Sequence, residues 1–303
     1  MIKIYKKLAA GIDMGGTNLR VGLVDAGGKI LIKISEPTKK ENRRMLIRQI
    51  IKLINSILPK KRTSMLGIGI GAPGPLDQEK GIIFSTPNLP GWKRFNIVVP
   101  LKKEFGIPVV LDNDANAAAL AEWRFGAGKG FKNMIYLTIS TGIGGGIIIN
   151  GNLYRGLGNA GELGHMIVDW KSKARCGCGN YGDLEALASG TGIKNQTKKD
   201  SKEIFEMVKN GNKQAITIIN NVLTVLGVGL VNCCHIFDPD IVVLGGSVAT
   251  NNKEIIFPFL RRFVKENVMA GFRKNIKILP AKLGDDVGII GAAAAVFEKA
   301  CFF

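Results

Sequence analysis

The spacing of apolar residues along the chain alternates between two patterns, which predicts a mixed α/β protein. Short apolar runs of strand length are bounded by glycine, proline or acidic residues. The predicted strands cover residues 8–13, 19–25, 65–71, 108–111, 133–140, 144–149, 241–247 and 276–279. Between them, longer segments carry apolar residues every three or four positions, as amphipathic helices do. The predicted helices cover residues 41–58, 117–125, 184–190, 204–208, 215–237, 255–264 and 288–297.

Two strand pairs are joined by glycine-rich turns. Residues 8–13 are apolar up to Asp13, a Met-Gly-Gly-Thr-Asn turn follows, and an apolar strand resumes. Backbone N–H groups in such a turn can bind phosphate, here from Gly15, Gly16 and Thr17, without the helix N-terminus of a dinucleotide-binding fold. Since Asp13 would face the same phosphates, a bridging Mg²⁺ is implied. A tight hairpin with a solvated aspartate is the alternative.

The second strand pair repeats this pattern in residues 133–149, with the turn Ser-Thr-Gly-Ile-Gly-Gly-Gly. Repetition of one supersecondary unit indicates an internal duplication. We expect one copy in each of two lobes, with the copies facing each other across a cleft.

Two further segments carry polar side chains suited to ligand binding. The strand at 108–111 delivers Asp112, Asn113, Asp114 and Asn116 to its carboxyl end, where ligands bind in open α/β sheets. Capping of the following helix would explain one such residue but not all of them. Asn88 lies between two prolines in residues 87–92, either as a ligand-binding amide or in an ordinary solvent loop.

Glutamate, histidine, cysteine and aspartate residues gather in residues 162–185. Imidazole and thiolate groups at close spacing are typical zinc ligands, while the two glutamates can accept hydrogen bonds from hydroxyl groups. The residues are Glu162, His165, Cys176, Cys178, Asp183 and Glu185.

Composition narrows the classes of protein. The 303 residues carry a net charge of +18, but the lysines are scattered and not interleaved with aromatics, so nucleic acid is not the expected partner. An odd number of cysteines predicts a reducing compartment. We find neither a signal-peptide pattern nor a run of about 18–20 continuous apolar residues, and we therefore expect a cytoplasmic protein without a membrane partner.

Five motifs in a fixed order identify a family. The chain resembles the ROK sugar kinases of bacteria and archaea over nearly its full length, most closely their glucokinases. The motifs are Gly-Ile-Asp-Met-Gly-Gly-Thr (11–17), Asn-Asp-Ala-Asn-Ala-Ala (113–118), Ser-Thr-Gly-Ile-Gly-Gly-Gly (140–146), Glu-Leu-Gly-His (162–165) and Cys-Gly-Cys-Gly-Asn-Tyr-Gly (176–182).

The resemblance implies the two-lobed, actin-like ATPase (ribonuclease H-like) α/β fold with a central cleft. We expect residues 1–113 and the C-terminal helix at about 288–303 to form a small lobe, and residues 114–287 a large lobe with the metal-binding loop.

The resemblance also implies roles for individual residues. Asp114 would be the general base, favoured in its ionised form by the helix that it begins. ATP and Mg²⁺ would be bound by Asp13, Gly15, Gly16, Thr17, Thr141, Gly142, Gly144, Gly245 and Gly246. The sugar would be bound by Asn88, Asn113, Glu162, His165 and Glu185.

The metal site departs from the family pattern, which usually has a third cysteine where this chain has Asp183. His165, Cys176 and Cys178 still supply three zinc ligands, and an aspartate oxygen is an acceptable fourth. We expect a structural Zn²⁺, more weakly held, with a metal-free loop as the alternative. Zinc on one ring nitrogen of His165 would orient the other nitrogen towards the sugar.

The expected reaction is ATP-dependent phosphorylation of the 6-hydroxyl of a hexose, most simply D-glucose to glucose 6-phosphate. Kinases of N-acetylmannosamine, N-acetylglucosamine or fructose are alternatives, because residues 87–92 and 156–161 would shape the pocket around carbon 2. A sugar-responsive regulator without catalysis is the alternative of another class. The family's repressors carry a DNA-binding domain ahead of the first phosphate strand, which begins here by Leu8. A homodimer or homotetramer is expected from the resemblance.

Overall fold

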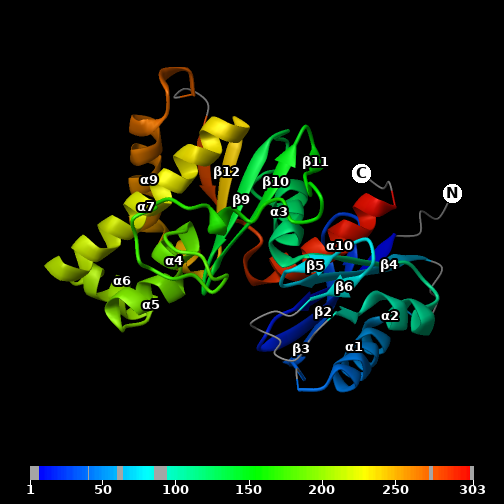
Figure 1. The fold of residues 1–303 in the computed structure, drawn as a ribbon. Helices are drawn as coiled ribbons and strands as arrows, with labels where there is room; N and C mark the ends of the chain where they lie inside the picture. The colour runs from blue at the N-terminus through cyan, green and yellow to red at the C-terminus, as the bar shows by residue number, and fades with distance from the viewer. Residues whose placement is uncertain (1–6, 40, 60–63, 85–93, 273–275, 301–303) are drawn as a thin grey trace. The chain divides into compact units, whose positions relative to one another are not determined.

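The structure is a computed structural model that describes residues 7–39, 41–59, 64–84, 94–272 and 276–300. Its contacts divide the chain into two compact units (Figure 1). Unit 1 comprises Met1–Gly126, Arg155–Asn159 and Leu283–Phe303, and unit 2 comprises Ala127–Tyr154 and Ala160–Lys282.

Unit 1 is a five-stranded sheet covered by helices on both faces. The strand order is β3-β2-β1-β4-β8, with β1, β2 and β3 antiparallel and β1, β4 and β8 parallel. The strands are β1 (Leu8–Met14), β2 (Asn18–Asp25), β3 (Ile30–Pro37), β4 (Met65–Ala72) and β8 (Val109–Asn113). Alternate residues of β1 enter different hydrophobic clusters, because successive side chains of a strand point to opposite faces.

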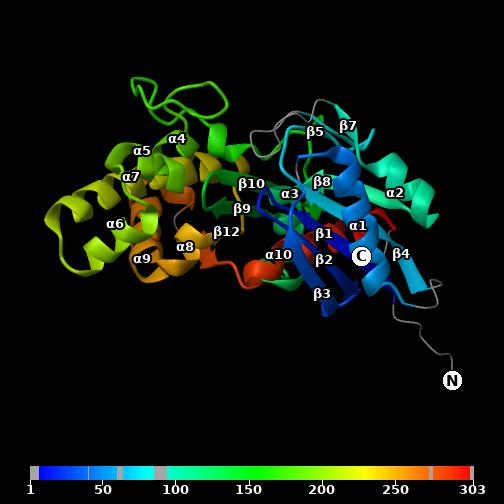
Figure 2. The same ribbon diagram turned by 90° about the horizontal axis from the view of Figure 1, so that it is seen from below.

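In its described residues, unit 1 is completed by helices on both faces of the sheet and by a small sheet of two-residue strands. Helices α1 (Arg43–Ile57) and α2 (Val98–Phe105) pack on one face of the large sheet, and α3 (Asp114–Phe125) and α10 (Val287–Lys299) pack on the other (Figure 2). The small sheet consists of β5 (Leu76–Asp77), β6 (Ile82–Ile83) and β7 (Phe95–Asn96).

Glycines bring α10 unusually close to the sheet. A Cβ atom added at Gly69 in β4 would lie 1.7 Å from the carbonyl oxygen of Ala292, and one at Gly11 in β1 would lie 2.0 Å from that of Ile289. Both oxygens belong to helix backbone, so neither contact can be relieved by turning a side chain. The glycines of these strands are therefore packing residues of the core.

Gly69→Ala is expected to lower the free energy of unfolding by roughly 3 kcal/mol, because α10 must move away from β4 to admit the methyl group. Denaturant unfolding of the purified protein measures this difference. Gly271→Ala is the matched control, since an added Cβ there has nothing within 4 Å. Equal stability of the two variants would contradict the packing argument.

Unit 2 is built on a second five-stranded sheet with the order β11-β10-β9-β12-β13. The strands are β9 (Met134–Ile139), β10 (Ile143–Ile149), β11 (Asn152–Leu153), β12 (Ile241–Gly245) and β13 (Lys277–Pro280). The helices are α4 (Leu184–Ala188), α5 (Gly190–Thr197), α6 (Ser201–Lys209), α7 (Lys213–Phe237), α8 (Ser247–Asn251) and α9 (Lys253–Asn267). Short 3₁₀ turns cover Leu163–His165, Ala270–Phe272 and, in unit 1, Gly284–Asp286.

The two sheets have the same topology. In each, the first three strands along the chain form an antiparallel meander, and two parallel strands are added beside the first. One glycine hairpin belongs to each unit, β1–β2 in unit 1 and β9–β10 in unit 2. The duplication predicted from the two hairpins therefore extends over both complete sheets.

By length and composition alone, helix α7 could cross a membrane. The sequence pattern did not indicate this, because polar residues interrupt the apolar residues of the helix. Its buried side chains, including Leu223, Leu226 and Leu230, pack into the core of unit 2 against α4, α6 and α9. This packing is typical of the central helix of a globular domain.

Some boundaries differ from the sequence prediction. Unit 1 continues to Gly126 rather than ending after Asn113, because α3 packs on α10. Helix α3 begins at Asp114, as expected for the proposed base, three residues before the apolar helical segment that starts at Ala117. The sequence also missed β3 and α2. The first is an edge strand with largely exposed side chains, and the second is only eight residues long.

Candidate active site

The first glycine hairpin places Asp13 near the end of β1, beside a turn that Thr38 fixes. The Thr38 hydroxyl donates to the carbonyl oxygen of Gly15 at 2.7 Å, and its backbone N–H donates to that of Thr17 at 2.9 Å. Gly15 N–H closes the turn on the carbonyl of Asn18 at 3.0 Å. The turn is therefore held in one conformation.

Asp13 is partly buried and lies near both a positively charged and a negatively charged side chain. Burial, the largest effect, raises the pKa of its carboxyl from 3.8 to about 6, while Arg20 lowers it and the negative charge of Asp114 raises it. Arg20 is the cross-strand partner of Asp13, and its guanidinium lies 3.6 Å from the carboxylate. Gly288, in the first turn of α10, leaves room for this carboxylate, because an added Cβ would lie 2.5 Å from the Asp13 carboxyl carbon. A cation bound here would favour the ionised form.

Asn113 is the N-cap of α3, and Asp114 is its first helical residue. The side-chain oxygen of Asn113 accepts from the N–H groups of Ala115 at 2.8 Å and Asn116 at 3.2 Å. Among the four polar residues at this strand end, the one that caps the helix is thus Asn113. Because its oxygen is used in the cap, the Asn113 amide group is left to donate to a ligand.

Asp114 is exposed to solvent, yet it is crowded by protein. Loss of hydration raises the pKa of its carboxyl above the usual range, and N–H donation from Ala115, at 2.8 Å, lowers it. The N–H groups at the helix start thus favour the ionised form, as expected, but loss of hydration has the larger effect and the net direction of the pKa shift is upward. The charge of Asp114 also acts on Asp13, so the two carboxylates share one side of unit 1.

The second glycine hairpin is braced by the helices that follow it. The carbonyls of Ser140 and Thr141 accept from the N–H groups of Gly190 and Thr191 at the start of α5, at 2.8 and 3.0 Å. Gly144 pairs with Thr138 across the hairpin. The exposed Thr141 and the partly exposed Gly142 form the tip of the turn.

Glu185, in α4, connects this turn to the cysteine cluster. One carboxylate oxygen accepts from the N–H of Ile143 at 2.8 Å, and the other lies 3.5 Å from the sulfur of Cys176. A Cβ on Gly142 would lie 2.4 Å from the first oxygen, so this glycine makes room for the carboxylate.

His165, Cys176, Cys178 and Asp183 come together as predicted, with one ligand atom from each within 4.8 Å of the others. His165 Nδ1 lies 3.1 Å from Asp183 Oδ2 and 3.6 Å from Cys176 Sγ, and Cys178 Sγ lies 3.5 Å from Asp183 Oδ2. A tetrahedral zinc ion with bonds of about 2.0–2.3 Å needs ligand separations of roughly 3.3–3.8 Å. The three separations given lie near this range, and the wider ones, up to 4.8 Å, need the side chains to close around the ion, so the four residues can hold zinc after a small adjustment.

Asp183 is completely buried and uses its two oxygens differently. Oδ1 accepts from the N–H of Ala186 at 2.7 Å as the N-cap of α4, while Oδ2 faces the cluster. Burial, followed by a hydrogen bond with Asp183, raises the pKa of the Cys176 thiol, so zinc binding here would release a proton. Since Nδ1 of His165 faces the cluster, Nε2 is the nitrogen on the side of Glu162, 4.0 Å from its carboxylate.

Gly245 ends β12 and Gly246 follows it, and both allow a close approach to β9. Gly246 has φ +83°, and an added Cβ would lie 2.4 Å from the carbonyl oxygen of Ile139. A Cβ on Gly245 would lie 2.5 Å from the hydroxyl of Tyr136. Packing thus explains both glycines independently of the predicted contact with ATP.

The predicted site residues are divided between the units. Unit 1 contains Asp13, Gly15, Gly16, Thr17, Asn113 and Asp114, whereas Asn88 lies outside the described residues. Unit 2 contains Thr141, Gly142, Gly144, Glu162, His165, Cys176, Cys178, Asp183, Glu185, Gly245 and Gly246.

Sequence reasoning missed Arg20, Thr38 and Arg155. Arg20 could have been found from the hairpin register, because it pairs with Asp13. Thr38 and Arg155 act on residues distant in the sequence, and no local pattern indicates this.

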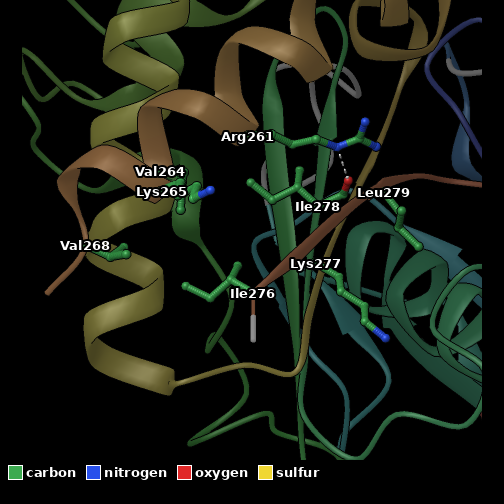
Figure 3. A pocket seen from close by; sticks show the side chains of 8 residues that line it. All are labelled: Arg261, Val264, Lys265, Val268, Ile276, Lys277, Ile278 and Leu279. Carbon is green, nitrogen blue, oxygen red and sulfur yellow. Dashed lines mark hydrogen bonds between the residues drawn. The ribbon is translucent and has the colours of Figure 1, made fainter. Parts of the chain in front are cut away.

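A cavity of about 310 Å³ lies elsewhere in unit 2, between α9 and β13 (Figure 3). Its lining is aliphatic and basic, and Arg261 donates through Nε to the carbonyl of Ile278 at 2.9 Å. The lining residues include no carboxylate or imidazole and none of the predicted site residues. We assign no catalytic role to it.

Comparison with known proteins identifies the same family as the sequence motifs. The model of the ROK family matches residues 9–299. A glucokinase of Thermotoga maritima is 36% identical over 311 residues, covering 95% of this chain and 97% of its own length. Xylose repressors are also among the relatives, at 31% identity.

Solved structures of ROK family proteins have a similar fold. A ROK hexokinase from Thermus thermophilus superposes with a TM-score of 0.87 at 35% identity, covering 98% of this chain and 100% of that one. A ROK glucokinase from Streptomyces griseus, in complex with glucose and AMPPNP, has a TM-score of 0.77 at 31% identity, covering 94% and 98%.

Proposed function

The chain belongs to the ROK family, and we propose that it is an ATP-dependent sugar kinase that phosphorylates the 6-hydroxyl of a hexose, most simply D-glucose. The observation that carries this proposal is the pair of carboxylates in unit 1. Asp13 lies beside a phosphate-sized glycine turn, and Asp114 begins the helix that follows β8. Both lie at the same edge of the sheet, because Asp13 pairs with Gly71 of β4 and Gly71 pairs with Asp112 of β8. The match to a glucokinase crystallised with glucose and an ATP analogue supports the choice of substrates.

Phosphoryl transfer requires mainly alignment and neutralisation of charge. In our proposal the substrate is ATP with its Mg²⁺, bound through Asp13 and through backbone N–H groups of both glycine turns. The sugar O6 forms a bond to the γ-phosphorus as the bond to the bridging oxygen of ADP breaks. The O6 proton passes to Asp114, whose raised pKa makes it a stronger base than an aspartate with the ordinary pKa.

The sugar would be bound by donors and acceptors that the fold holds in place. The Asn113 amide is oriented by its cap, and His165 Nε2 is oriented by the contacts of Nδ1 with Asp183 and Cys176. Glu162 and Glu185 would accept from sugar hydroxyls. A sugar that lacks one of these hydroxyls would leave a buried group unpaired, which is how such sites discriminate.

We further propose that the cluster of His165, Cys176, Cys178 and Asp183 holds a structural Zn²⁺. The geometric fit and the mixed thiolate, imidazole and carboxylate set support this ion. When bound, zinc would neutralise the thiolates and fix His165 in one tautomer. In this proposal Asp183 and Cys176 hold the imidazole through Nδ1, which leaves Nε2 to bind the sugar.

Removal of the metal is expected to raise the KM for sugar by about 10- to 100-fold with a smaller effect on kcat, because the orientation of His165 is lost. Cys176→Ser should give the same result and reduce zinc content measured by elemental analysis. Cys234→Ala is the matched control, since that buried cysteine lies in α7 outside the cluster. Unchanged sugar affinity after complete zinc removal would contradict this role.

Asp183→Cys should restore the family's third cysteine and tighten zinc binding. It also removes the N-cap of α4, which costs about 1 kcal/mol of stability. Zinc affinity and metal-free stability should therefore change in opposite directions.

The proposed activity is tested by a coupled assay of ADP release with glucose, mannose, fructose, N-acetylglucosamine and N-acetylmannosamine. The highest kcat/KM is expected for glucose, and a higher value for another of these sugars would reassign the substrate. No turnover of any of them would refute the enzyme proposal and favour the regulator, a class to which the xylose-repressor relatives point.

Two expectations rest on the resemblance and composition alone. A homodimer or homotetramer can be checked by light scattering of the purified protein. Cytoplasmic localisation can be checked by fractionation of the cells that make it.

A further inference from the structure

Arg155 forms a partly buried ion-pair network in unit 1 that the proposed reaction does not by itself require. Its guanidinium donates through Nε and one terminal nitrogen to Asp112 Oδ2, at 3.0 and 2.7 Å, and through the same terminal nitrogen to Glu298 at 2.6 Å. Asp112 is only 1% exposed, although it lies in the edge strand β8. The arginine therefore neutralises a buried carboxylate.

The network leads directly to the proposed sugar and base residues. The other oxygen of Asp112, Oδ1, accepts from the backbone N–H of Asn113 at 2.9 Å. Asn113 in turn caps α3, which begins with Asp114. One chain of hydrogen bonds thus runs from the guanidinium of Arg155 to the turn that presents both residues.

Arg155 belongs to a short segment of unit 1 that is flanked in the sequence by unit 2 on both sides. Residues 155–159 belong to unit 1, but the chain on both sides of them, residues 127–154 and 160–282, belongs to unit 2. A second contact holds the segment, because the side-chain amide of Gln78 donates to the carbonyl of Gly158 at 2.7 Å. The segment is thus attached to unit 1 at two points.

We propose that Arg155 is a positioning residue for sugar phosphorylation, which fixes through Asp112 the turn that presents Asn113 and Asp114. This inference rests on the proposed function. A guanidinium suits the task because its planar fork can bind Asp112 with two donors and still reach Glu298. Without it, Asp112 would be a buried carboxylate lacking its cation and would have to move or take up a proton.

The test compares Arg155→Met, Arg155→Lys and the double variant Arg155→Met with Asp112→Asn. Lys52→Met is the matched control, because it removes an exposed ion pair of unit 1, with Glu36, away from this turn. For each protein, kcat, the KM for sugar, the KM for ATP and the folded fraction by near-UV circular dichroism are measured with the preferred sugar.

Arg155→Met is expected to lower kcat/KM for sugar on the order of 10²-fold, which is the effect of misplacing a catalytic group by about 1 Å. Both kcat and the KM for sugar should change, whereas the KM for ATP should stay constant. Arg155→Lys should lie between Arg155→Met and wild type, since one ammonium cannot reproduce the fork. The double variant should recover most of the loss, because the amide introduced by Asp112→Asn retains an oxygen for the Asn113 N–H and carries no charge. The control should match wild type.

If the wild-type protein is active, any of three results would overturn the inference. The first is unchanged kinetics in Arg155→Met, and the second is a loss of its activity in proportion to the folded fraction, with the KM for sugar and the KM for ATP unaltered. The third is a double variant whose kcat/KM is as low as that of Arg155→Met. An inactive wild-type protein would instead refute the proposed function and the inference with it. If Arg155→Met fails to fold, the lysine and double variants still decide between these outcomes.

Discussion

Asp114→Asn is expected to lower kcat with glucose by about 10³-fold and to leave the KM for ATP unchanged, because it removes the general base but keeps the shape of the side chain. The amide oxygen can still accept from the N–H of Ala115, so the start of α3 should be preserved. The coupled assay of ADP release measures the effect.

Stability measurements separate loss of the base from loss of the fold. Loss of hydration raises the pKa of Asp114 and disfavours its ionised form, so a neutral amide should leave thermal stability equal or higher. Asp77→Asn is the control, since that carboxylate of unit 1 pairs with Lys80 on the surface. Full turnover by Asp114→Asn would refute its role as the base.

Asp13→Asn is expected to raise the KM for MgATP and lower kcat, together by roughly 10²-fold or more in kcat/KM, because the carboxylate that binds the substrate's Mg²⁺ is lost. The binding of sugar alone, measured by calorimetry, should not change and serves as the internal control. An unaltered KM for MgATP would contradict the assignment of this residue.

The same carboxyl predicts a pH dependence. With a pKa of about 6, Asp13 is increasingly protonated below pH 6, so kcat/KM for MgATP should fall as the pH decreases through 6. Stability of the nucleotide-free protein should show the opposite trend. The folded-state pKa exceeds the unfolded value, so the folded state binds more protons between about pH 4 and 6 and loses stability as the pH rises through that range. Activity that is constant from pH 7 to pH 5 would contradict this electrostatic account.

Much of the fold could be predicted from the sequence because local patterns determine it. Apolar strands broken by Gly-Gly turns identified both hairpins, and the spacing of His165, Cys176 and Cys178 identified a cluster that the structure brings together. The complete equivalence of the two sheets could not be predicted, because the sequence did not reveal β3. This edge strand has largely exposed side chains and lacks the regular alternation of apolar and polar residues that marks a strand.

The electrostatics of the site could not be predicted from local patterns. Arg155 reaches Asp112 across 43 positions of sequence, and the first turn of α10 reaches Asp13 from the far end of the chain. At Asp114, loss of hydration raises the pKa by more than the N–H groups of the helix start lower it, and a sequence pattern does not indicate which effect is larger. Such properties arise from packing between distant segments.

The most direct test of the central claim is a crystal structure with glucose and a non-hydrolysable ATP analogue. The account predicts the glucose O6 within about 2.6–3.2 Å of an Asp114 carboxylate oxygen, opposite the γ-phosphate, with Mg²⁺ on the side of Asp13. A structure in which O6 contacts neither Asp114 nor a water bound to it, with Asp13 remote from the phosphates, would contradict the account.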